Sequence, residues 1–285
     1  MLGSFLAAAV LALAAPQQTD TTFSVGSARR LHVENHNGSV VVRSWNRDEV
    51  RVRASHGGSS RVDINRSSNS VSIELENRRG RPGSAEMELT VPQRFEIEIE
   101  GMNTSIEVVG IEGGLALETI NGNISVQDSE GRLEMESISG RITVRNSRGT
   151  LSAEGTNHGI DVAGFEGNVS IATVNGSLSL TGIRADRVEA ETINGRIEYQ
   201  GELRDSGSYE LSTHNGEVVI FVPEGTNASV TVSTHNGEID SSFPVQLRET
   251  RGRSRASFNI GTGRGARVEI TSFGGPVRIR RPNQR

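Results

Sequence analysis

A short motif recurs through the centre of this sequence and constrains its fold more than any other feature. The residues from Glu118 read E-T-I-N-G-N-I-S-V, and related copies begin at Glu136, Ala172, Glu191, Ser212 and Ser233, with a degenerate copy around His158. The turn glycines are Gly122, Gly140, Gly159, Gly176, Gly195, Gly216 and Gly237, separated by 18, 19, 17, 19, 21 and 21 residues. Self-similarity at such a period is typical of a repeat protein that stacks short units.

Within each repeat, apolar and polar residues alternate, as in Leu133 and Met135 or Ile142 and Val144. A period of two is typical of a β-strand with one buried face. A second half-repeat, such as E-G-R-L-E-M from Glu130, lies between the turn motifs, so each period holds two strands and two corners. Helices are not expected, because no window of the mature chain keeps a helical apolar pattern and glycine is too frequent.

Two all-β architectures fit these strands. Asn-Gly between alternating runs is a strong signal for a β-hairpin, which leaves an antiparallel sandwich as an alternative. Successive turns of a sandwich need not resemble one another, whereas every second corner here carries the same residues at nearly constant spacing. The repeat therefore predicts a right-handed parallel β-solenoid with coils of 17–21 residues and capping strands at both ends.

Stacked coils would place each T-I-N-G corner about 4.8 Å from its copy in the next coil. The asparagines would then form a ladder of side-chain amides, and the threonines a second ladder. The glycines would supply the positive φ that the bend needs, while Ile120, Ile138, Val174 and Ile193 would point into the core. The predicted ladder residues are Asn121, Asn175, Asn194, Asn215 and Asn236, with Thr119, Thr173, Thr192, Thr213 and Thr234.

Composition divides the chain into four predicted segments. Residues 1–14 form an apolar run that ends in a small-x-small pattern, typical of a secretory signal peptide. Residues 21–101 are expected to form an N-terminal β capping region, residues 102–247 the solenoid, and residues 248–285 a basic C-terminal β cap. The mature protein would then be exported, without a transmembrane segment, to the periplasm, the outer surface or the medium.

The charged residues exclude several chemistries and partners. All 30 basic side chains are arginines and cysteine is absent, which excludes a lysine Schiff base, a thiol nucleophile, a disulfide and a thiolate zinc site. Residues 95–247 contain 8 arginines and 24 acidic residues, whereas residues 248–285 contain 10 arginines and 2 acidic residues. Nucleic acid is not an expected partner, because the acidic centre would repel phosphate and the basic flanks lack interleaved aromatics.

Several stretches resemble a known family. They are G-S-V-V-V-R-S-W-N-R-D-E-V from Gly38, V-P-Q-R-F-E-I-E-I-E from Val91, the tandem T-I-N-G units, and V-P-E-G-T-N-A-S-V-T-V-S-T-H-N-G-E-I from Val222. Together they resemble the "putative adhesin" domain family, exported bacterial β-solenoid proteins with a domain of unknown function. The resemblance implies a non-catalytic surface or envelope protein. Because Ser139 and His158 replace the corner asparagine, the amide ladder is expected to break there.

One set of corner side chains is a candidate metal site. His214 and His235 occupy the same position in what the repeat predicts to be adjacent coils, and Glu217 and Glu238 follow at matching offsets. A stacked pair of imidazoles would suit a divalent metal. Repeat copying alone also places identical residues in register, and the sequence favours that interpretation, with solvated corner residues and no cofactor.

A column of glutamates is the second candidate. Glu118, Glu136, Glu154 and Glu191 recur at one repeat position, where stacked carboxylates would repel unless a cation such as calcium or an arginine intervened. The sequence lacks the glycine- and aspartate-rich nonapeptide of calcium-loaded β-rolls. Nearby arginines, Arg132, Arg141 and Arg196, favour neutralisation without a metal.

An enzyme is not expected, because polysaccharide-cleaving β-helices carry long loops that wall a cleft, whereas the corners between residues 115 and 240 are short. The favoured interpretation is a non-catalytic, adhesin-like envelope or surface protein that displays a rigid acidic face between basic ends. Its expected partners are an anionic envelope polymer, a glycan, another protein or a second copy of itself. The alternatives are a carbohydrate-binding or polysaccharide-depolymerising β-helix and a periplasmic partner of an envelope-stress signalling system.

Overall fold

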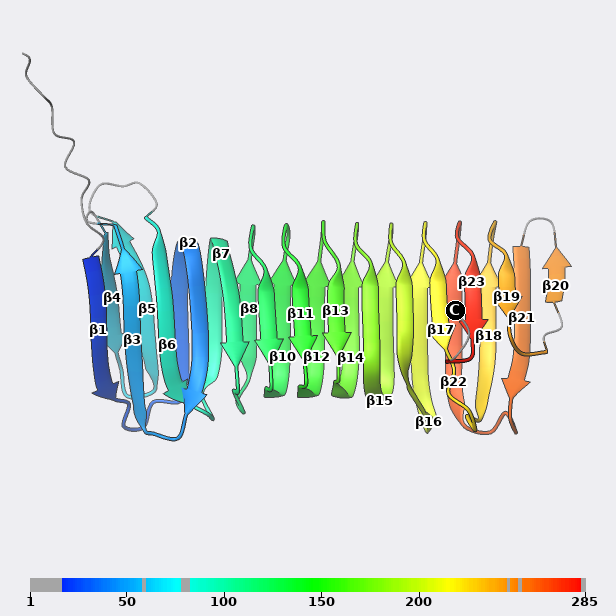
Figure 1. The fold of residues 1–285 in the computed structure, drawn as a ribbon, viewed down its shortest axis with the longest axis horizontal. Helices are drawn as coiled ribbons and strands as arrows, with labels where there is room; N and C mark the ends of the chain where they lie inside the picture. Colours follow the sequence, from blue (N-terminus) through cyan, green and yellow to red (C-terminus); the bar gives the residue numbers. More distant parts are fainter. Residues whose placement is uncertain (1–16, 58–59, 78–82, 245–246, 251–252, 283–285) are drawn as a thin grey trace, which may run out of the picture.

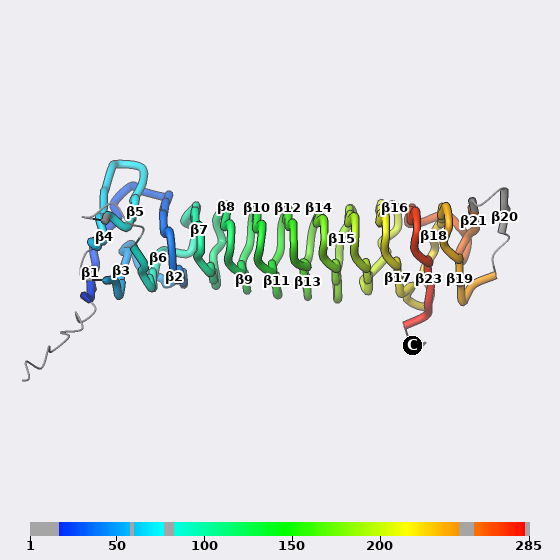
Figure 2. The backbone as a smooth tube through the Cα atoms, turned by 90° about the horizontal axis from the view of Figure 1, so that it is seen from above, coloured from blue at the N-terminus to red at the C-terminus, as the bar shows by residue number. Residues whose placement is uncertain are grey.

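The computed structural model describes residues 17–57, 60–77, 83–244, 247–250 and 253–282. Figure 1 shows strands lined up side by side along one long axis, and Figure 2 shows the backbone winding around that axis as a flattened coil. None of the described residues belongs to a helix, so that part of the chain has no helix that could cross a membrane. The all-β, solenoid-like expectation is confirmed. The predicted signal peptide, residues 1–14, lies outside the described residues.

Two rows of parallel strands form the middle of the stack, on opposite sides of the coil (Figure 2). The first row contains the start of β7 (Glu96–Val109), β8 (Leu115–Thr119), β10 (Glu130–Ser137), β12 (Arg148–Gly155), β14 (Glu166–Thr173) and the ends of β15 (Leu178–Thr192) and β16 (Ile197–Thr213). The second row contains the end of β7, β9 (Ile124–Gln127), β11 (Ile142–Arg145), β13 (Ile160–Ala163), the starts of β15 and β16, and β17 (Val218–Phe221). The antiparallel sandwich is therefore wrong for the centre of the chain.

Antiparallel strands lie at the N-terminal end. β2 (Arg30–Trp45) runs through both rows and pairs in parallel with β7, β5 (Ser70–Asn77) and β6 (Ala85–Pro92). Outside these strands lie β1 (Gln17–Ser24), β3 (Glu49–His56) and β4 (Ser60–Arg66), which pair antiparallel with β3, β6 and β5, respectively. After β2 the chain thus continues toward the N-terminal end of the stack through β3–β6, and it returns to the other edge of β2 at β7.

At the C-terminal end, spatial order and chain order differ. β22 (Ala266–Ser272) lies between β16 and β18 (Ala228–Thr234), and β23 (Val277–Arg280) lies between β17 and β19 (Ile239–Ser241). Figure 1 shows this coil in red among the yellow strands. Beyond this coil lie β18 and β19, then β21 (Arg253–Ile260), antiparallel to β18, and β20 (Leu247–Thr250), antiparallel to β21.

The expectation that residues 248–285 form a C-terminal cap is therefore wrong for residues 266–280, which lie inside the stack. Their insertion has a physical reason, because β22 and β23 have a hydrogen-bonding neighbour on both edges inside the stack. An unpaired strand edge would leave backbone groups open to other chains. The S-F-G-G corner that begins at Ser272 is a degenerate copy of T-I-N-G, too divergent for the repeat pattern to predict.

The core consists of apolar columns. Strands β8, β10, β12 and β14 pair with a register offset that places like residues above one another, as in Leu115, Leu133, Leu151 and Val169. In the second row Ile124, Ile142, Ile160 and Leu178 form a similar column. All of these side chains are buried. A narrow core of this kind fits aliphatic side chains and explains the low aromatic content of 4%.

Both tyrosines lie on β16, where Tyr199 pairs with Leu180 and Tyr209 with Val188 of β15. The Tyr209 hydroxyl donates to the Ala185 carbonyl at 2.6 Å, and the Tyr199 hydroxyl donates to the Glu202 carbonyl at 2.9 Å. The two rings meet edge to face, with centroids 5.8 Å apart. Burial raises the pKa of both tyrosines, so each hydroxyl stays protonated and its hydrogen bond satisfies a buried polar group.

The glycines of the repeated corner are needed for space. Gly140, Gly195 and Gly216 do not have a positive φ, so that expectation is wrong. A Cβ atom added to any of them would overlap the backbone carbonyl of the corner glycine in the preceding coil. Positive φ occurs instead at the other corner, at 51° in Asp128 and 48° in Asn146.

Replacing Gly140 by alanine is expected to destabilise the protein by about 1–3 kcal/mol, the usual effect of overpacking. The new methyl group would overlap the Gly122 carbonyl, and adjacent coils would have to move apart. Urea unfolding measures the change. Gly114→Ala is the matched control, because the nearest atom to its new Cβ would be the Arg132 carbonyl oxygen at 3.8 Å. Equal unfolding midpoints for the two variants would contradict this explanation of the corner.

Candidate functional site

The repeated corners join into a continuous ridge along one edge of the stack, which we call the corner ridge. At each corner, one main-chain carbonyl accepts a hydrogen bond from an N–H of the neighbouring coil, one repeat position further along. For example, the Ser139 N–H donates to the Ile120 carbonyl at 2.8 Å. The residues that supply these carbonyls form the outer column, in spatial order Met102, Ile120, Ile138, Thr156, Val174, Ile193, His214, Phe273 and, one coil further, His235. The backbone thus fixes the spacing of every side chain on the ridge.

The corner threonines point inward and are buried. In four of them the Oγ1 hydroxyl donates to a backbone carbonyl of the preceding coil, at distances of 2.9–3.1 Å. The pairs are Thr119 to Thr104, Thr173 to His158, Thr192 to Gly176 and Thr213 to Gly195. The Oγ1 of Thr234 accepts from the Gly237 N–H at 2.9 Å. The predicted threonine ladder is therefore wrong: these hydroxyls bond to the backbone rather than to one another. Other residues also interrupt the column, Ser137 and Gly155 between Thr119 and Thr173, and Ser272 between Thr213 and Thr234.

The corner asparagines bond to one another in two runs. Nδ2 donates to the Oδ1 of the preceding coil from Asn121 to Asn103 and from Asn103 to Asn37, at 2.9 and 2.8 Å. The second run goes from Asn215 to Asn194 to Asn175, with both bonds at 2.9 Å. Asn236 lies apart from this run, because Gly274 of the inserted coil stacks next to Asn215.

The middle of the amide column corrects the register predicted from sequence. The Thr173 hydroxyl donates to the carbonyl of His158, whereas the equivalent Thr192 hydroxyl donates to the carbonyl of the corner glycine Gly176. His158 therefore occupies the glycine position of its corner. Asn157 therefore holds the asparagine position, and its Nδ2 donates to Ser139 Oγ at 3.5 Å. The degenerate copy replaces a glycine rather than an asparagine, and Gly159 is not a corner glycine.

The apolar corner residues point outward, contrary to expectation. Side chains alternate along extended backbone, so the residue after a buried threonine faces solvent. Among the described residues, the large hydrophobic side chains that are exposed are Met102, Ile120, Ile138, Val174, Ile193 and Phe273, at 36–44% of their surface. All of them belong to the outer column.

The predicted histidine pair is separated by Phe273. Its ring lies between the imidazoles of His214 and His235, with centroids 4.6 and 4.7 Å away and planes within 5° and 7° of parallel. The two histidines therefore cannot share a metal ion, because the inserted coil lies between their coils. Glu217 pairs instead with Arg278 and, at 3.3 Å, with Arg196, while the side chain of Glu238 is exposed.

The glutamate column is longer than the sequence predicted. Strand register places six glutamates as successive cross-strand neighbours, in the order Glu74, Glu34, Glu100, Glu118, Glu136 and Glu154. Ala172 follows and separates Glu191 from them. Partial desolvation, and then the charges of Glu136, Glu100 and Glu98, raise the pKa of Glu118.

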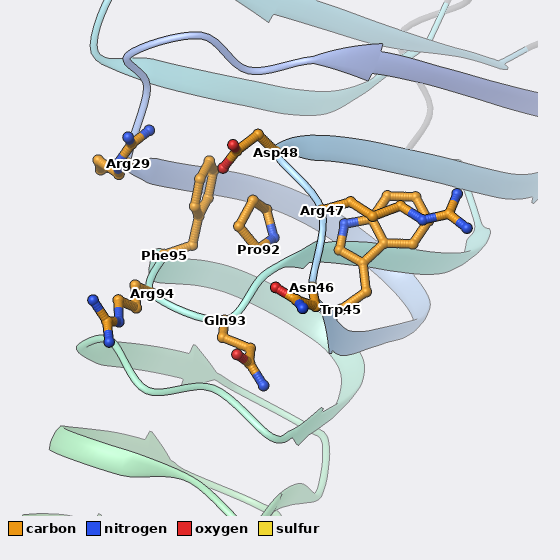
Figure 3. Close-up of a pocket in the computed structure, with 9 residues that line it drawn as sticks. All are labelled: Arg29, Trp45, Asn46, Arg47, Asp48, Pro92, Gln93, Arg94 and Phe95. Carbon is orange, nitrogen blue, oxygen red and sulfur yellow. The ribbon is translucent and has the colours of Figure 1, made fainter.

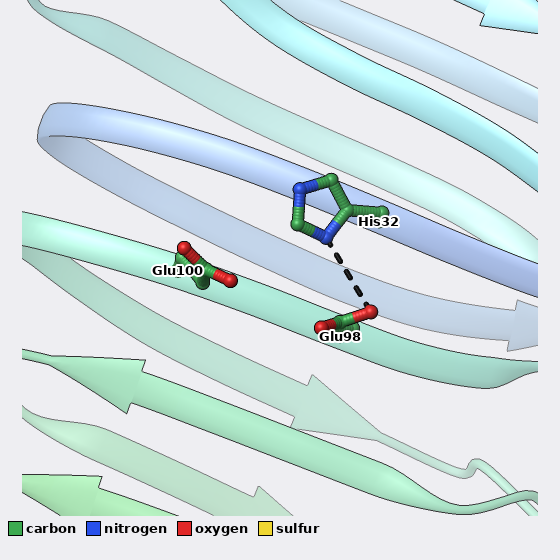
Figure 4. A group of neighbouring side chains, drawn as sticks. All are labelled: His32, Glu98 and Glu100. Carbon is green, nitrogen blue, oxygen red and sulfur yellow. Dashed lines mark ion pairs between the residues drawn. The ribbon is translucent and has the colours of Figure 1, made fainter.

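His32 lies beside this column (Figure 4). Its Nε2 is 3.4 Å from Glu34 and its Nδ1 is 3.5 Å from Glu98. One ligand atom each from His32, Glu98 and Glu100 lie within 4.8 Å of one another. Imidazole and carboxylates are ligands for transition metals, and a protonated imidazole would neutralise the same carboxylates. No sequence motif predicts this group, because only the pairing of β2 with β7 brings its distant residues together.

The profile of the Toastrack DUF4097 family matches residues 28–280. The chain belongs to this family. The family resemblance drawn from the sequence is thereby confirmed. No curated protein is similar to this Toastrack chain in sequence.

Solved structures similar to the Toastrack chain include two bacterial proteins. A putative cell adhesion protein from Clostridium sporogenes is 10% identical, with 93% of this chain and 99% of that chain covered and a TM-score of 0.26. A putative adhesin from Bacteroides fragilis is 9% identical, with 92% and 97% covered and a TM-score of 0.39.

In this Toastrack chain, Glu118→Gln is expected to raise the free energy of unfolding at pH 7. The gain should lie toward the lower end of roughly 0.2–1 kcal/mol, the range for cross-strand charge pairs, because Glu118 is exposed. The folded state raises the pKa of Glu118, so the carboxylate destabilises the fold above that pKa and its protonation relieves this as the pH falls. The gain should therefore disappear below about pH 4.

Urea unfolding of both proteins at pH 7 and below pH 4 measures this difference. Glu191→Gln is the control, because the cross-strand neighbours of Glu191 are Ala172 and Ser212. A gain of the same size in the control, or a gain in Glu118→Gln that persists at low pH, would contradict repulsion within the glutamate column.

Proposed function

We propose that this Toastrack protein is an exported, non-catalytic, adhesin-like binding protein of the cell envelope or surface, and that the corner ridge is its contact surface. One observation carries the proposal. The large hydrophobic side chains exposed among the described residues gather in a single column, beside a column of asparagine amides. Contiguous exposed apolar surface is typical of an interaction site.

The ridge suits an extended partner that lies along the stack. Such a partner would meet an outer-column side chain and a neighbouring amide about every 4.8 Å. Each ladder amide keeps one N–H and one oxygen lone pair free, because the ladder bond uses only one of each. The main-chain bonds between coils hold these groups in place, so little conformational entropy is lost on binding.

The proposal includes the finer parts of the sequence prediction. They are the right-handed winding, coils of 17–21 residues with caps at both ends, and the division at residues 14 and 101. Export to the periplasm, the outer surface or the medium is supported by the apolar run of residues 1–14. An envelope polymer, a glycan or another protein is the proposed partner. Short corners between strands support the absence of catalysis, because they leave little from which to wall a cleft.

The triple substitution Ile120→Ser, Ile138→Ser and Ile193→Ser tests the ridge. Burying the exposed part of an isoleucine contributes about 1 kcal/mol, so binding to purified cell envelopes should weaken at least tenfold. Stability should change little, because these side chains are already exposed. Co-sedimentation with envelopes and with a glycan panel measures the binding.

A control variant carries Ser125→Ala, Thr143→Ser and Ser179→Ala on the outer face of the second row. Its binding should match that of the unmodified protein. If the ridge variant stays folded and binds envelopes as tightly as the control, the corner ridge is not the contact surface.

A further inference from the structure

A hollow of about 410 Å³ lies at the N-terminal end of the stack, across the coil from the corner ridge. Three turns meet there: the turn before β2, the turn between β2 and β3, and the turn between β6 and β7 (Figure 3). Arg29, Arg47 and Arg94 line the hollow together with Trp45 and Phe95. Arg29 and Arg94 lie on the side of Phe95, and Arg47 extends over Trp45 on the other side (Figure 3). These residues are far apart in sequence, so only the fold assembles the group.

The hollow is positively charged. Asp48 is the acidic residue among those that line it, against the three arginines. Arg29 is held by backbone carbonyls, since one guanidinium nitrogen donates to Gly26 at 3.1 Å and to Ala28 at 2.7 Å. Within the described part of the chain, no carboxylate oxygen lies within 4.0 Å of the guanidinium of Arg29 or Arg47. Arg94 contacts Glu112 at 3.5 Å, with 86% of its side chain exposed.

The arginine-rich C-terminal segment is different. Arg278 pairs with Glu217, and Arg280 pairs with Asp240, on the outer face of the second row. Because these carboxylates neutralise the strand arginines, the high arginine count of that segment does not create an anion site on those strands. The N-terminal hollow, by contrast, offers guanidinium groups that an incoming anion could pair with.

The apolar part of the hollow is rigid. The Trp45 indole N–H donates to the Glu49 carbonyl at 2.7 Å, and the Arg47 guanidinium lies 5.0 Å from the centre of the indole ring. Phe95 is fully buried beneath the hollow. The amides of Asn46 and Gln93 lie at the rim (Figure 3). Because Phe95 is covered, Trp45 supplies the aromatic surface of the hollow, beside guanidinium and amide groups.

We propose that this hollow binds an acidic sugar unit of an anionic polysaccharide. The sugar carboxylate would pair with the arginines, its C–H faces would pack on the aromatic surface, and its hydroxyls would bond to the amides. The volume suits a small ligand, and the open rim lets a polymer continue on either side. This site is separate from the corner ridge, so it goes beyond the proposed function and does not depend on it.

The test uses the intrinsic fluorescence of Trp45, the single tryptophan of the chain. The full chain is titrated with tetrameric oligomers of galacturonate, mannuronate and glucuronate–N-acetylglucosamine, with neutral maltotetraose and with inorganic phosphate. At least one uronate oligomer should change the Trp45 emission saturably, and the other two classes of ligand should not. No response to any of the three oligomers would overturn the proposal, as would an equal response to phosphate alone.

Calorimetry on variants locates the binding. Arg47→Ala and Arg94→Ala should each weaken binding of the uronate oligomer about tenfold, as expected for loss of one charge-assisted hydrogen bond. The matched control combines Arg145→Ala and Arg187→Ala, two exposed arginines elsewhere on the stack, and should bind normally. Unchanged binding by a folded Arg47→Ala/Arg94→Ala variant would overturn the proposal. The triple isoleucine variant of the ridge should bind the uronate oligomer normally, so the two proposals fail independently.

Discussion

Close contact between backbones at the repeated corner is the constraint on which the rest of this structure depends. Each coil bonds to the next through main-chain groups, and at the corner the chains approach so closely that a Cβ atom would overlap a carbonyl. Glycine is therefore required at this position because it has no side chain. A threonine lies three residues before this glycine, and its hydroxyl donates to a main-chain carbonyl at the corner of the preceding coil, as from Thr192 to Gly176. The side chains between them have only the outside of the coil available.

The sequence was sufficient for the architecture because the repeat and the alternation of apolar residues have few other physical explanations. Leu133 and Met135, chosen from alternation alone, are buried in the first row. The direction of the Ile120 side chain was predicted wrongly. A hydrophobic residue next to a polar threonine suggests a buried isoleucine and an exposed threonine, whereas the corner buries Thr119 and exposes Ile120. Local pattern therefore identified the strands but not which corner residue faces the core.

Other features depend on contacts that chain order hides. His214 and His235 follow one another in the repeat, yet Phe273 lies between them because a later segment inserts into the stack. The hollow around Trp45 and the group around His32 are also formed by segments far apart in sequence. A repeat predicts which residues are equivalent, but spatial neighbours at the ends of the stack are set by how the chain leaves and re-enters it.

Disulfide cross-linking tests the stacking most directly, because the chain has no cysteine of its own. Adjacent corners are about 4.8 Å apart, which a disulfide can bridge, whereas corners two coils apart are about twice that distance and cannot be joined. On oxidation, the pair His214→Cys and Phe273→Cys should cross-link, although 58 residues separate the two positions in the chain. The pair His214→Cys and His235→Cys should not. Cross-linking of the second pair without the first would contradict the insertion of the C-terminal coil and the order of side chains on the ridge.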